Sequence, residues 1–447
     1  MTGSILIRGG RVIDPSQGID AVADVLVLEG KVAEVKIGGG LSAPGGTPIL
    51  DAAGLVVTPG FVDLHCHLRE PGFEEKETIA TGTRAAARGG FTTVCCMPNT
   101  DPAIDTRAAV EFIFEKARSE GAIRVLPVAA VTRGRKGKQL VEMGELADAG
   151  VVGFSDDGDP VADSQLMRSA LAYTRPMGLP IMDHCEDPAL AGGVMHEGKV
   201  ATRLGLRGVP AAAEESMVSR DILLAELTGG YAHISHVSTA GSVALIRYAK
   251  EKGLSVTTEV TPHHLTLTHE LVCGQFSTGE MPYDTNTKVN PPLREASDVE
   301  ALIEALASGV IDAVATDHAP HTIVDKLSPY DEAAFGISGI ETALGSVLSL
   351  VHAGRIELRT LVERMTWAPA RIIDRKGMGI GTLAAGAVGD VTVFSLDEEW
   401  QVDAQGFASR GKNSPIDGRK LKGRVIATIF GGNVAHNAAR EATSGGG

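Results

Sequence analysis

The sequence predicts an α/β fold, namely a (β/α)8 TIM barrel with a small discontinuous β domain built from both chain ends. Eight short apolar, β-branched runs recur along the middle of the chain, and helical patterns lie between most of them. The runs expected as strands are 61–65, 91–97, 124–130, 151–155, 180–184, 232–236, 255–260 and 311–316. Eight strands that alternate with helices are typical of a parallel barrel closed on itself.

The two ends of the chain have a different sequence pattern from the middle. Residues 1–57 form short apolar runs broken by turn residues such as Gly9-Gly10 and Asp14-Pro15, which predicts a small antiparallel sheet. Similar runs return after Gly377, at 391–394 and 424–430. We therefore expect residues 1–57 and 378–440 to form one small β-sandwich domain, and residues 58–377 to form the barrel.

Helices are predicted where apolar and polar residues alternate before a glycine. Examples are 77–88 before Gly89-Gly90, 138–149 before Gly150, and 210–227 with Pro210 as its first residue. Two longer polar segments, 261–294 and 319–339, are predicted as loops.

Composition and charge indicate which classes of protein the chain can belong to. The chain has 447 residues, of which 43% are hydrophobic, and its net charge of −15 argues against a nucleic-acid or membrane surface. No apolar stretch reaches the ~20 residues that a membrane span needs. Five cysteines without a Cys-x-x-Cys pair predict free thiols in a reducing compartment. Since residues 1–4 lack a basic segment, we expect no signal peptide and a cytoplasmic location.

Histidines and aspartates gather where the predicted strands end. His65 and His67 lie two apart, so both point to one face of a strand, and barrel enzymes place their reactive groups at the carboxyl ends of the strands. Later strand ends carry Asp156, Asp157, Asp183, His184, His233, His236, Asp317 and His318. Nitrogen and oxygen ligands without thiolates suit zinc, manganese or cobalt, and zinc is the first expectation.

These residues resemble a known family. Asp63-x-His65-x-His67, with His184, His236 and Asp317 on later strands, is similar to the amidohydrolase superfamily. The segments 67–72 (HLREPG), 97–100 (MPNT), 183–186 (DHCE) and 316–321 (TDHAPH) resemble bacterial type I dihydroorotases. The resemblance implies reversible cyclisation of N-carbamoyl-L-aspartate to L-dihydroorotate in de novo pyrimidine biosynthesis.

The resemblance also implies a set of metal ligands. One or two zinc ions per subunit would be held by His65, His67, Asp157, His184, His236 and Asp317. Many relatives bridge two metals with a carboxylated lysine after strand four, whereas this chain has Asp156-Asp157, as in a branch that uses aspartate. We assign the ligand to Asp157 and keep Asp156 as the alternative.

Substrate contacts follow from the same resemblance. They are His67, Arg69, Asn99, Asn290, His321, Phe335 and Gly336. The fork of Arg69 suits bidentate binding of a carboxylate. A bound zinc can lower the pKa of its water from about 15.7 to roughly 7, and Asp317 resembles the family's general acid/base, which moves a proton to the ring nitrogen.

Several other residues near the predicted strand ends allow a second interpretation. His233 is the alternative to His236, His263 and His264 are expected to be structural, and Cys66 should face away from the site. Asp183 and Glu186 are expected to support the ligands rather than to bind metal.

The sequence also leads to expectations about partners and to two rival functions. We expect a small-molecule substrate, a homodimer, and association with aspartate transcarbamoylase, but no nucleic acid or membrane. The rival functions are an allantoinase or hydantoinase and a non-catalytic scaffold.

Overall fold

Parallel strands close into a barrel in the middle of the chain. The computed structural model describes residues 3–274, 282–374 and 377–439. One parallel sheet holds β6 (Phe61–Cys66), β7 (Phe91–Cys96) and β8 (Arg124–Pro127). A second holds β9 (Ile181–Asp183), β12 (Ala232–Ile234), β13 (Val256–Val260) and β14 (Ala313–Val314).

Isolated parallel bridges join the two sheets into a ring. Phe154 bridges Ala129 on one side and Ile181 on the other, so the segment 151–155 takes the place of the fourth strand. On the opposite side, Cys66 bridges His318. The predicted (β/α)8 barrel is therefore confirmed, with each of the eight apolar runs in its expected place.

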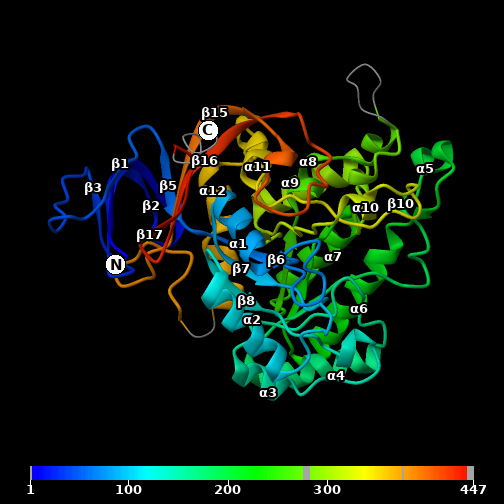
Figure 1. Cartoon of the computed structure of the whole chain (residues 1–447). Helices are drawn as coiled ribbons and strands as arrows, with labels where there is room; N and C mark the ends of the chain where they lie inside the picture. Colours follow the sequence, from blue (N-terminus) through cyan, green and yellow to red (C-terminus); the bar gives the residue numbers. More distant parts are fainter. Residues whose placement is uncertain (1–2, 275–281, 375–376, 440–447) are drawn as a thin grey trace.

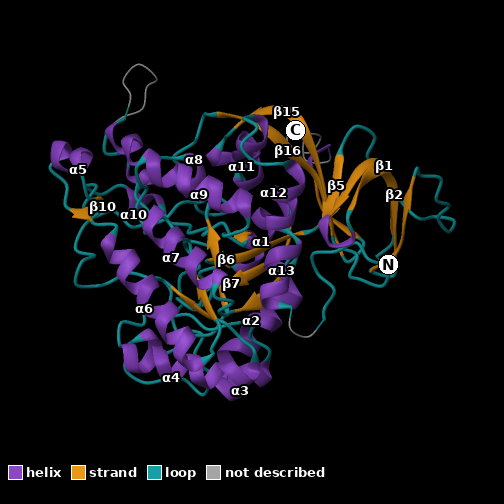
Figure 2. Cartoon of the chain, turned by 180° about the vertical axis from the view of Figure 1, so that it is seen from behind, coloured by secondary structure: helices purple, strands orange, loops and turns teal. Residues whose placement is uncertain are grey.

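Helices surround these strands (Figure 2). They are α1 (Ile79–Arg88), α2 (Arg107–Glu120), α3 (Met143–Ala149), α4 (Ser164–Thr174), α5 (Lys199–Leu204), α6 (Ala212–Thr228), α7 (Ala240–Glu251), α8 (Pro262–Thr266), α9 (Ala296–Ser308), α10 (Ile323–Lys326), α11 (Ala343–His352), α12 (Leu358–Met365) and α13 (Trp367–Ile373). Short strands β10 (Met195–His196) and β11 (Gly208–Val209) pair in a loop. None of the helices described is long and apolar enough to cross a membrane.

Several helix boundaries differ from the prediction, and local hydrogen bonds explain one of them. α1 begins at Ile79 because Thr78 accepts a hydrogen bond from the backbone of Thr81 and caps the helix. α3 begins only at Met143, and α6 begins two residues after Pro210. The predicted loops 261–294 and 319–339 contain the short helices α8 and α10.

A separate sheet combines both ends of the chain (Figure 1). Its strands are β1 (Ile5–Asp14), β2 (Ile19–Leu28), β3 (Lys31–Ile37), β4 (Ile49–Asp51), β5 (Val56–Pro59), β15 (Val391–Gln401), β16 (Lys420–Phe430) and β17 (Asn433–Asn437). Their order is β17-β16-β15-β5-β1-β2-β3, with β4 also paired to β1. The prediction of an antiparallel sheet holds for most strand pairs, such as β1 with β2 and β15 with β16. It was wrong for β4 and β5, which return through a longer connection and pair parallel to β1.

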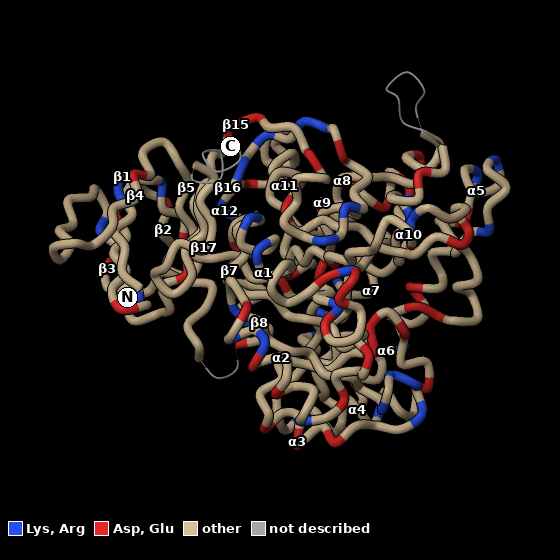
Figure 3. The backbone as a smooth tube through the Cα atoms, in the orientation of Figure 1, with Lys and Arg blue, Asp and Glu red and all other residues tan. Residues whose placement is uncertain are grey.

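Apolar packing explains why the two ends meet. Ile7, Val25 and Val57 from the first part of the chain share one buried cluster with Val393 and Ala427 from the last part. The larger core lies between the barrel strands and the surrounding helices. Acidic and basic side chains are interspersed along the part of the chain that the structure describes (Figure 3). The division into domains at residues 57/58 and 377/378 stays a prediction.

Candidate active site

The ends of β6 and β14 bring three predicted ligands together. His65 Nε2 lies 3.6 Å from Asp317 Oδ1, and His67 Nε2 lies 3.0 Å from the same oxygen. Asp63, at the start of the motif, accepts hydrogen bonds from the backbone N–H and the hydroxyl of Thr316, at 2.8 and 2.5 Å. Asp63 therefore fastens β6 to the end of β14, which positions the two histidines beside Asp317.

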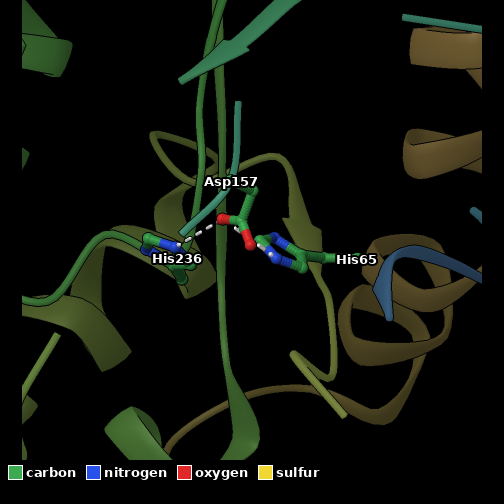
Figure 4. A group of neighbouring side chains, drawn as sticks. All are labelled: His65, Asp157 and His236. Carbon is green, nitrogen blue, oxygen red and sulfur yellow. Dashed lines mark ion pairs between the residues drawn. The ribbon is translucent and has the colours of Figure 1, made fainter. Parts of the chain in front are cut away.

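Asp157 occupies the centre of the cluster. Its Oδ1 lies 3.3 Å from His65 Nε2 and 3.5 Å from His236 Nε2, so the carboxylate stands between the two imidazoles (Figure 4). His184 Nδ1 lies 3.8 Å from Asp157 Oδ1 and 2.9 Å from His236 Nε2. All six predicted ligands thus share one buried site.

Two overlapping groups in this cluster have the spacing of a metal site. They are His65, Asp157 and His236, and His65, His67 and Asp317, with the ligand atoms of each group within 4.8 Å of one another. His65 Nε2, Asp157 Oδ1 and His236 Nδ1 are buried without a hydrogen-bond partner among the described residues. Because buried polar atoms are rarely left unsatisfied, these residues fit a divalent cation.

Hydrogen bonds on the far side of two histidines strengthen this fit. His67 Nδ1 lies 2.9 Å from Asn99 Oδ1, and His65 Nδ1 lies 2.8 Å from Glu259 Oε1. Both oxygens accept, so Nδ1 of each ring carries the proton and Nε2 keeps its lone pair for a cation. This is the arrangement that metal-binding histidines usually have.

The charges of the cluster also favour a cation. Burial opposes ionisation of Asp157, but the neighbouring imidazoles of His65 and His236 hold its pKa well below the usual value. Burial likewise opposes ionisation of Asp317, but the neighbouring imidazole of His67 lowers its pKa. Two carboxylates are therefore ionised among largely buried rings.

The backbone is strained at three residues of the site. Arg69, His236 and Asp317 have φ angles of 60°, 33° and 44°, in the left-handed region that residues other than glycine rarely adopt. Such conformations cost about 1–3 kcal/mol each and persist where the surrounding structure enforces them. The strain is concentrated where side chains must turn toward the cluster.

Glu259 belongs to the site although the sequence analysis missed it. It lies on β13, is fully buried, and contacts His65 through Oε1 and His233 Nε2 through Oε2, at 2.8 and 3.2 Å. Burial raises the pKa of Glu259, but hydrogen bonds from His233 and His65 lower it to about 2. The signal in the sequence that could have identified it is the position of an acidic residue within the apolar run 255–260. His233 pairs with Glu259, so His236 is the strand-end histidine that faces the cluster.

The remaining alternatives have partners of their own. Asp156 accepts hydrogen bonds from the backbone N–H groups of Val131 and Thr132, so Asp157 is the aspartate that faces the histidines. Asp183 lies 3.2 Å from Arg220 Nη2, whereas Glu186 lies 3.5 Å from His184 Nε2.

Cys66 and the histidine pair of α8 lie in structural surroundings. Cys66 donates to the carbonyl of Cys95, and burial raises the pKa of its thiol well above the usual value. His264 contacts the Thr261 hydroxyl and the Pro291 carbonyl. His263 is buried beside it, with ring centroids 4.6 Å apart.

A cavity of about 210 Å³ opens onto the cluster. The seven predicted substrate contacts all line it: His67, Arg69, Asn99, Asn290, His321, Phe335 and Gly336. Its wall offers one guanidinium, two amides and an imidazole above the two carboxylates. The cavity therefore suits a small, polar, anionic molecule.

Arg69 supplies the positive charge of this wall. Burial lowers its pKa to about 10, so it stays protonated at neutral pH. His321 Nε2 lies 2.8 Å from the Phe335 carbonyl, which can only accept, so this nitrogen carries a proton and cannot also accept from Arg69. The Arg69 guanidinium can therefore donate hydrogen bonds to the carboxylate of a ligand.

Comparison with known proteins supplies the family. The family described as "Dihydro-orotase-like" matches residues 54–242. A protein named dihydroorotase from Geobacter sp. (strain M21) is 53% identical over 436 residues, which are 97% of this chain and 100% of that protein. This chain belongs to the dihydroorotase family. A second dihydroorotase, from Pelotomaculum thermopropionicum, is 54% identical over 96% of this chain and 98% of its own length.

Solved structures of proteins with other names share the fold. An L-hydantoinase from Arthrobacter aurescens matches with a TM-score of 0.85 and 27% identity, over 97% of this chain and 96% of that chain. A dihydropyrimidinase from Brevibacillus agri NCHU1002 matches with a TM-score of 0.82 and 24% identity, over 97% and 95% of the two chains. The latter shows the fold alone.

This dihydroorotase family member has another histidine group, His196, His269 and Glu295, outside the cavity. Arg294 Nη1 lies 3.2 Å from His196 Nδ1. Because arginine only donates, that nitrogen accepts, and the proton of the neutral ring sits on Nε2, which faces Glu295. The guanidinium also repels a cation, so this group is a poor metal site.

Proposed function

We propose that this chain catalyses the reversible cyclisation of N-carbamoyl-L-aspartate to L-dihydroorotate. The observation that carries the proposal is the pairing of a carboxylate-centred histidine cluster with the partly buried cation Arg69 across one small cavity. Membership of the dihydroorotase family supports the same reaction.

We assign the metal-binding role to His65, His67, Asp157, His184, His236 and Asp317, and propose zinc, one or two ions per subunit. The donors are imidazole nitrogens and carboxylate oxygens, which suit zinc. When bound, the metal would supply Lewis-acid activation of water and of the amide carbonyl.

The residues of the wall bind and orient the substrate. Arg69 holds a substrate carboxylate through two parallel hydrogen bonds, which also fixes the plane of that group. Asn99, Asn290 and His321 provide polar contacts around the ring. Phe335 and Gly336 form part of the cavity wall that faces the substrate, so the reacting amide is held over the carboxylates.

Asp317 moves the proton. In the hydrolytic direction its ionised carboxylate takes a proton from the attacking water and delivers it to the ring nitrogen as the carbon–nitrogen bond breaks. In cyclisation it takes the proton from the carbamoyl nitrogen and returns it to the departing oxygen. His67 Nε2 lies 3.0 Å from Asp317 Oδ1, so the proposed base stands directly beside a proposed metal ligand.

Turnover of both compounds by the purified, zinc-loaded protein tests the proposal. Asp317→Asn keeps the shape of the side chain but removes the base, so kcat should fall by about 10²–10⁴-fold. Asp397→Asn, at an exposed surface pair with Lys422, is the matched control and should behave as wild type. Absence of turnover in both directions by the wild-type protein would refute the proposed reaction.

Substrate preference separates this reaction from that of a hydantoinase. Allantoin and simple hydantoins lack the carboxylate that Arg69 would bind, so they should be poor substrates. Preferential cleavage of either would assign the chain to that activity instead. The homodimer, the association with aspartate transcarbamoylase and the cytoplasmic location stay predictions from the sequence.

A further inference from the structure

The cavity is closed on one side by a loop that follows β14. Residues 319–337, here called the rim loop, contribute Ala319, His321, Phe335 and Gly336 to the cavity wall. The two ends of the rim loop meet, because the N–H of Ala319 donates to the Ile337 carbonyl at 2.9 Å. A Cβ on Gly336 would lie 2.8 Å from the Cβ of Ala319, so the contact is as close as glycine permits.

A segment from the distant C-terminal part of the chain reaches this loop. Residues 408–413, here called the strap, lie between β15 and β16. A Cβ on Gly411 would lie 2.4 Å from the Cβ of Pro320, so the strap packs directly on the rim loop. The strap ends at Asn413, which is 4% exposed.

The Asn413 side chain uses its full hydrogen-bonding capacity on the rim loop and the residue after it. Its Oδ1 accepts from the His321 N–H at 3.0 Å and from the Ser338 hydroxyl at 2.8 Å. Its Nδ2 donates to the Ala319 and Gly336 carbonyls, both at 3.0 Å. An asparagine amide has two donor hydrogens and one acceptor oxygen with two lone pairs, and all are used here.

The strap itself is fixed to the barrel. The N–H groups of Ala408 and Ser409 donate to the Glu341 carboxylate, each at 3.1 Å. The Ser409 hydroxyl donates to the Glu77 carboxylate at 2.5 Å. The carboxylates of Glu77 and Glu341 are both largely buried. Asn413 is therefore held rigidly, as a group that positions other residues must be.

We propose that Asn413 is a positioning residue, which sets the place of the cavity wall formed by Ala319, His321 and Gly336. This inference rests on the proposed function, since that wall is the one assigned to the substrate. Asn413 touches no part of the candidate metal cluster that the structure describes. Its loss should therefore weaken substrate binding more than the chemical step.

Asn413→Asp tests the inference with almost no change of shape. The carboxylate would face the two carbonyl oxygens of Ala319 and Gly336 with no hydrogen to donate, which pushes the rim loop away. We expect KM for N-carbamoyl-L-aspartate to rise about tenfold and kcat to change by less than about threefold, with an unchanged metal-to-protein ratio. Asn433→Asp, at the exposed start of β17, is the matched control.

Hydrogen–deuterium exchange gives a readout that does not depend on turnover. Peptides that cover 319–338 should exchange faster in Asn413→Asp than in the wild type or Asn433→Asp. Asn413→Ala removes the same hydrogen bonds without adding charge, and it decides the question should Asn413→Asp fail to accumulate.

The outcomes separate this inference from the proposed function. Unchanged KM and unchanged exchange in the variants would overturn the role of Asn413 while leaving the reaction intact. A parallel loss of kcat and bound metal would also overturn it, because that result indicates a general folding defect. Should the wild-type protein show no turnover, the proposed function fails, and the exchange of peptides 319–338 still decides the inference.

Discussion

Glu259 places Oε1 2.8 Å from Nδ1 of His65, on the side of the ring that faces away from Asp157. The same carboxylate contacts His233, so a buried acid on β13 is shared by two imidazoles from different strands. This contact fixes the proton of His65 on Nδ1 and leaves Nε2 as a metal ligand.

Glu259→Gln should weaken metal binding without removing any assigned ligand. Partners of this kind change metal affinity by about 10–100-fold, because the neutral amide orients and polarises the histidine less strongly. Metal retained after dialysis against graded chelator, measured by plasma mass spectrometry, checks the prediction. Glu300→Gln, at an exposed pair with Arg355, is the control. Equal retention by the two variants would show that Glu259 does not tune the site.

Arg69→Lys should raise KM substantially, although the substitution preserves the positive charge. Lysine offers a point charge in place of a planar fork, so bidentate binding of the substrate carboxylate is lost. We expect KM for N-carbamoyl-L-aspartate to rise by about 10–100-fold, which corresponds to roughly 1.4–2.8 kcal/mol. Steady-state kinetics at several substrate concentrations measures the effect. A wild-type KM would remove Arg69 from the binding site.

The sequence predicts those parts of the molecule that follow local patterns. The ring of eight strands and the convergence of His65, His184 and Asp317 were expected, because alternation along a strand and the common direction of parallel strands dictate both. The choice between Asp156 and Asp157 could not be made from sequence. It depends on which aspartate accepts hydrogen bonds from the backbone N–H groups of Val131 and Thr132. In the structure this is Asp156, which leaves Asp157 to face the histidines.

Contacts between distant segments could not be predicted. Asn413 lies in a polar stretch with no periodic pattern, and only the packing of the strap on the rim loop reveals its partners. The parallel pairing of β4 and β5 with β1 was missed for a similar reason, since a run of apolar residues does not specify which neighbour it pairs with.

Thiol reactivity should distinguish Cys273 from the other four cysteines. Cys66, Cys95, Cys96 and Cys185 are buried, and burial raises the pKa of each thiol, to about 12 for Cys96. Cys273 is partly exposed. Because the thiolate is the reactive form, we expect one fast equivalent with a disulfide reagent in the native protein and five after unfolding. Fast reaction of two or more native thiols would contradict this burial pattern.

Lys326 carries a buried amino group that should make stability depend on pH. Its Nζ donates to the carbonyls of Ala334 and Thr285, at 2.7 and 3.0 Å, and thereby ties the rim loop to the neighbouring segment. Burial lowers the pKa of Lys326 to about 7, although the charges of Asp284 and Asp325 oppose this and that of Lys288 adds to it. Below pH 7 the lysine is charged in both folded and unfolded chains. Between about pH 7 and 10.5 the folded chain releases the proton while the unfolded chain keeps it, so the free energy of unfolding rises with pH.

Lys326→Met isolates this contribution, because methionine keeps the apolar stem and does not titrate. The wild type should gain stability over the variant as pH rises from 7 to 9, by about 1 kcal/mol or more. The difference in thermal midpoint between the two proteins, measured at pH 6, 7, 8 and 9, checks the sign, since all other titrating groups are common to both. A difference that stays constant across this range would mean that Lys326 keeps its proton in the folded chain, and the hydrogen bonds to the two carbonyls would then outweigh the cost of burying its charge.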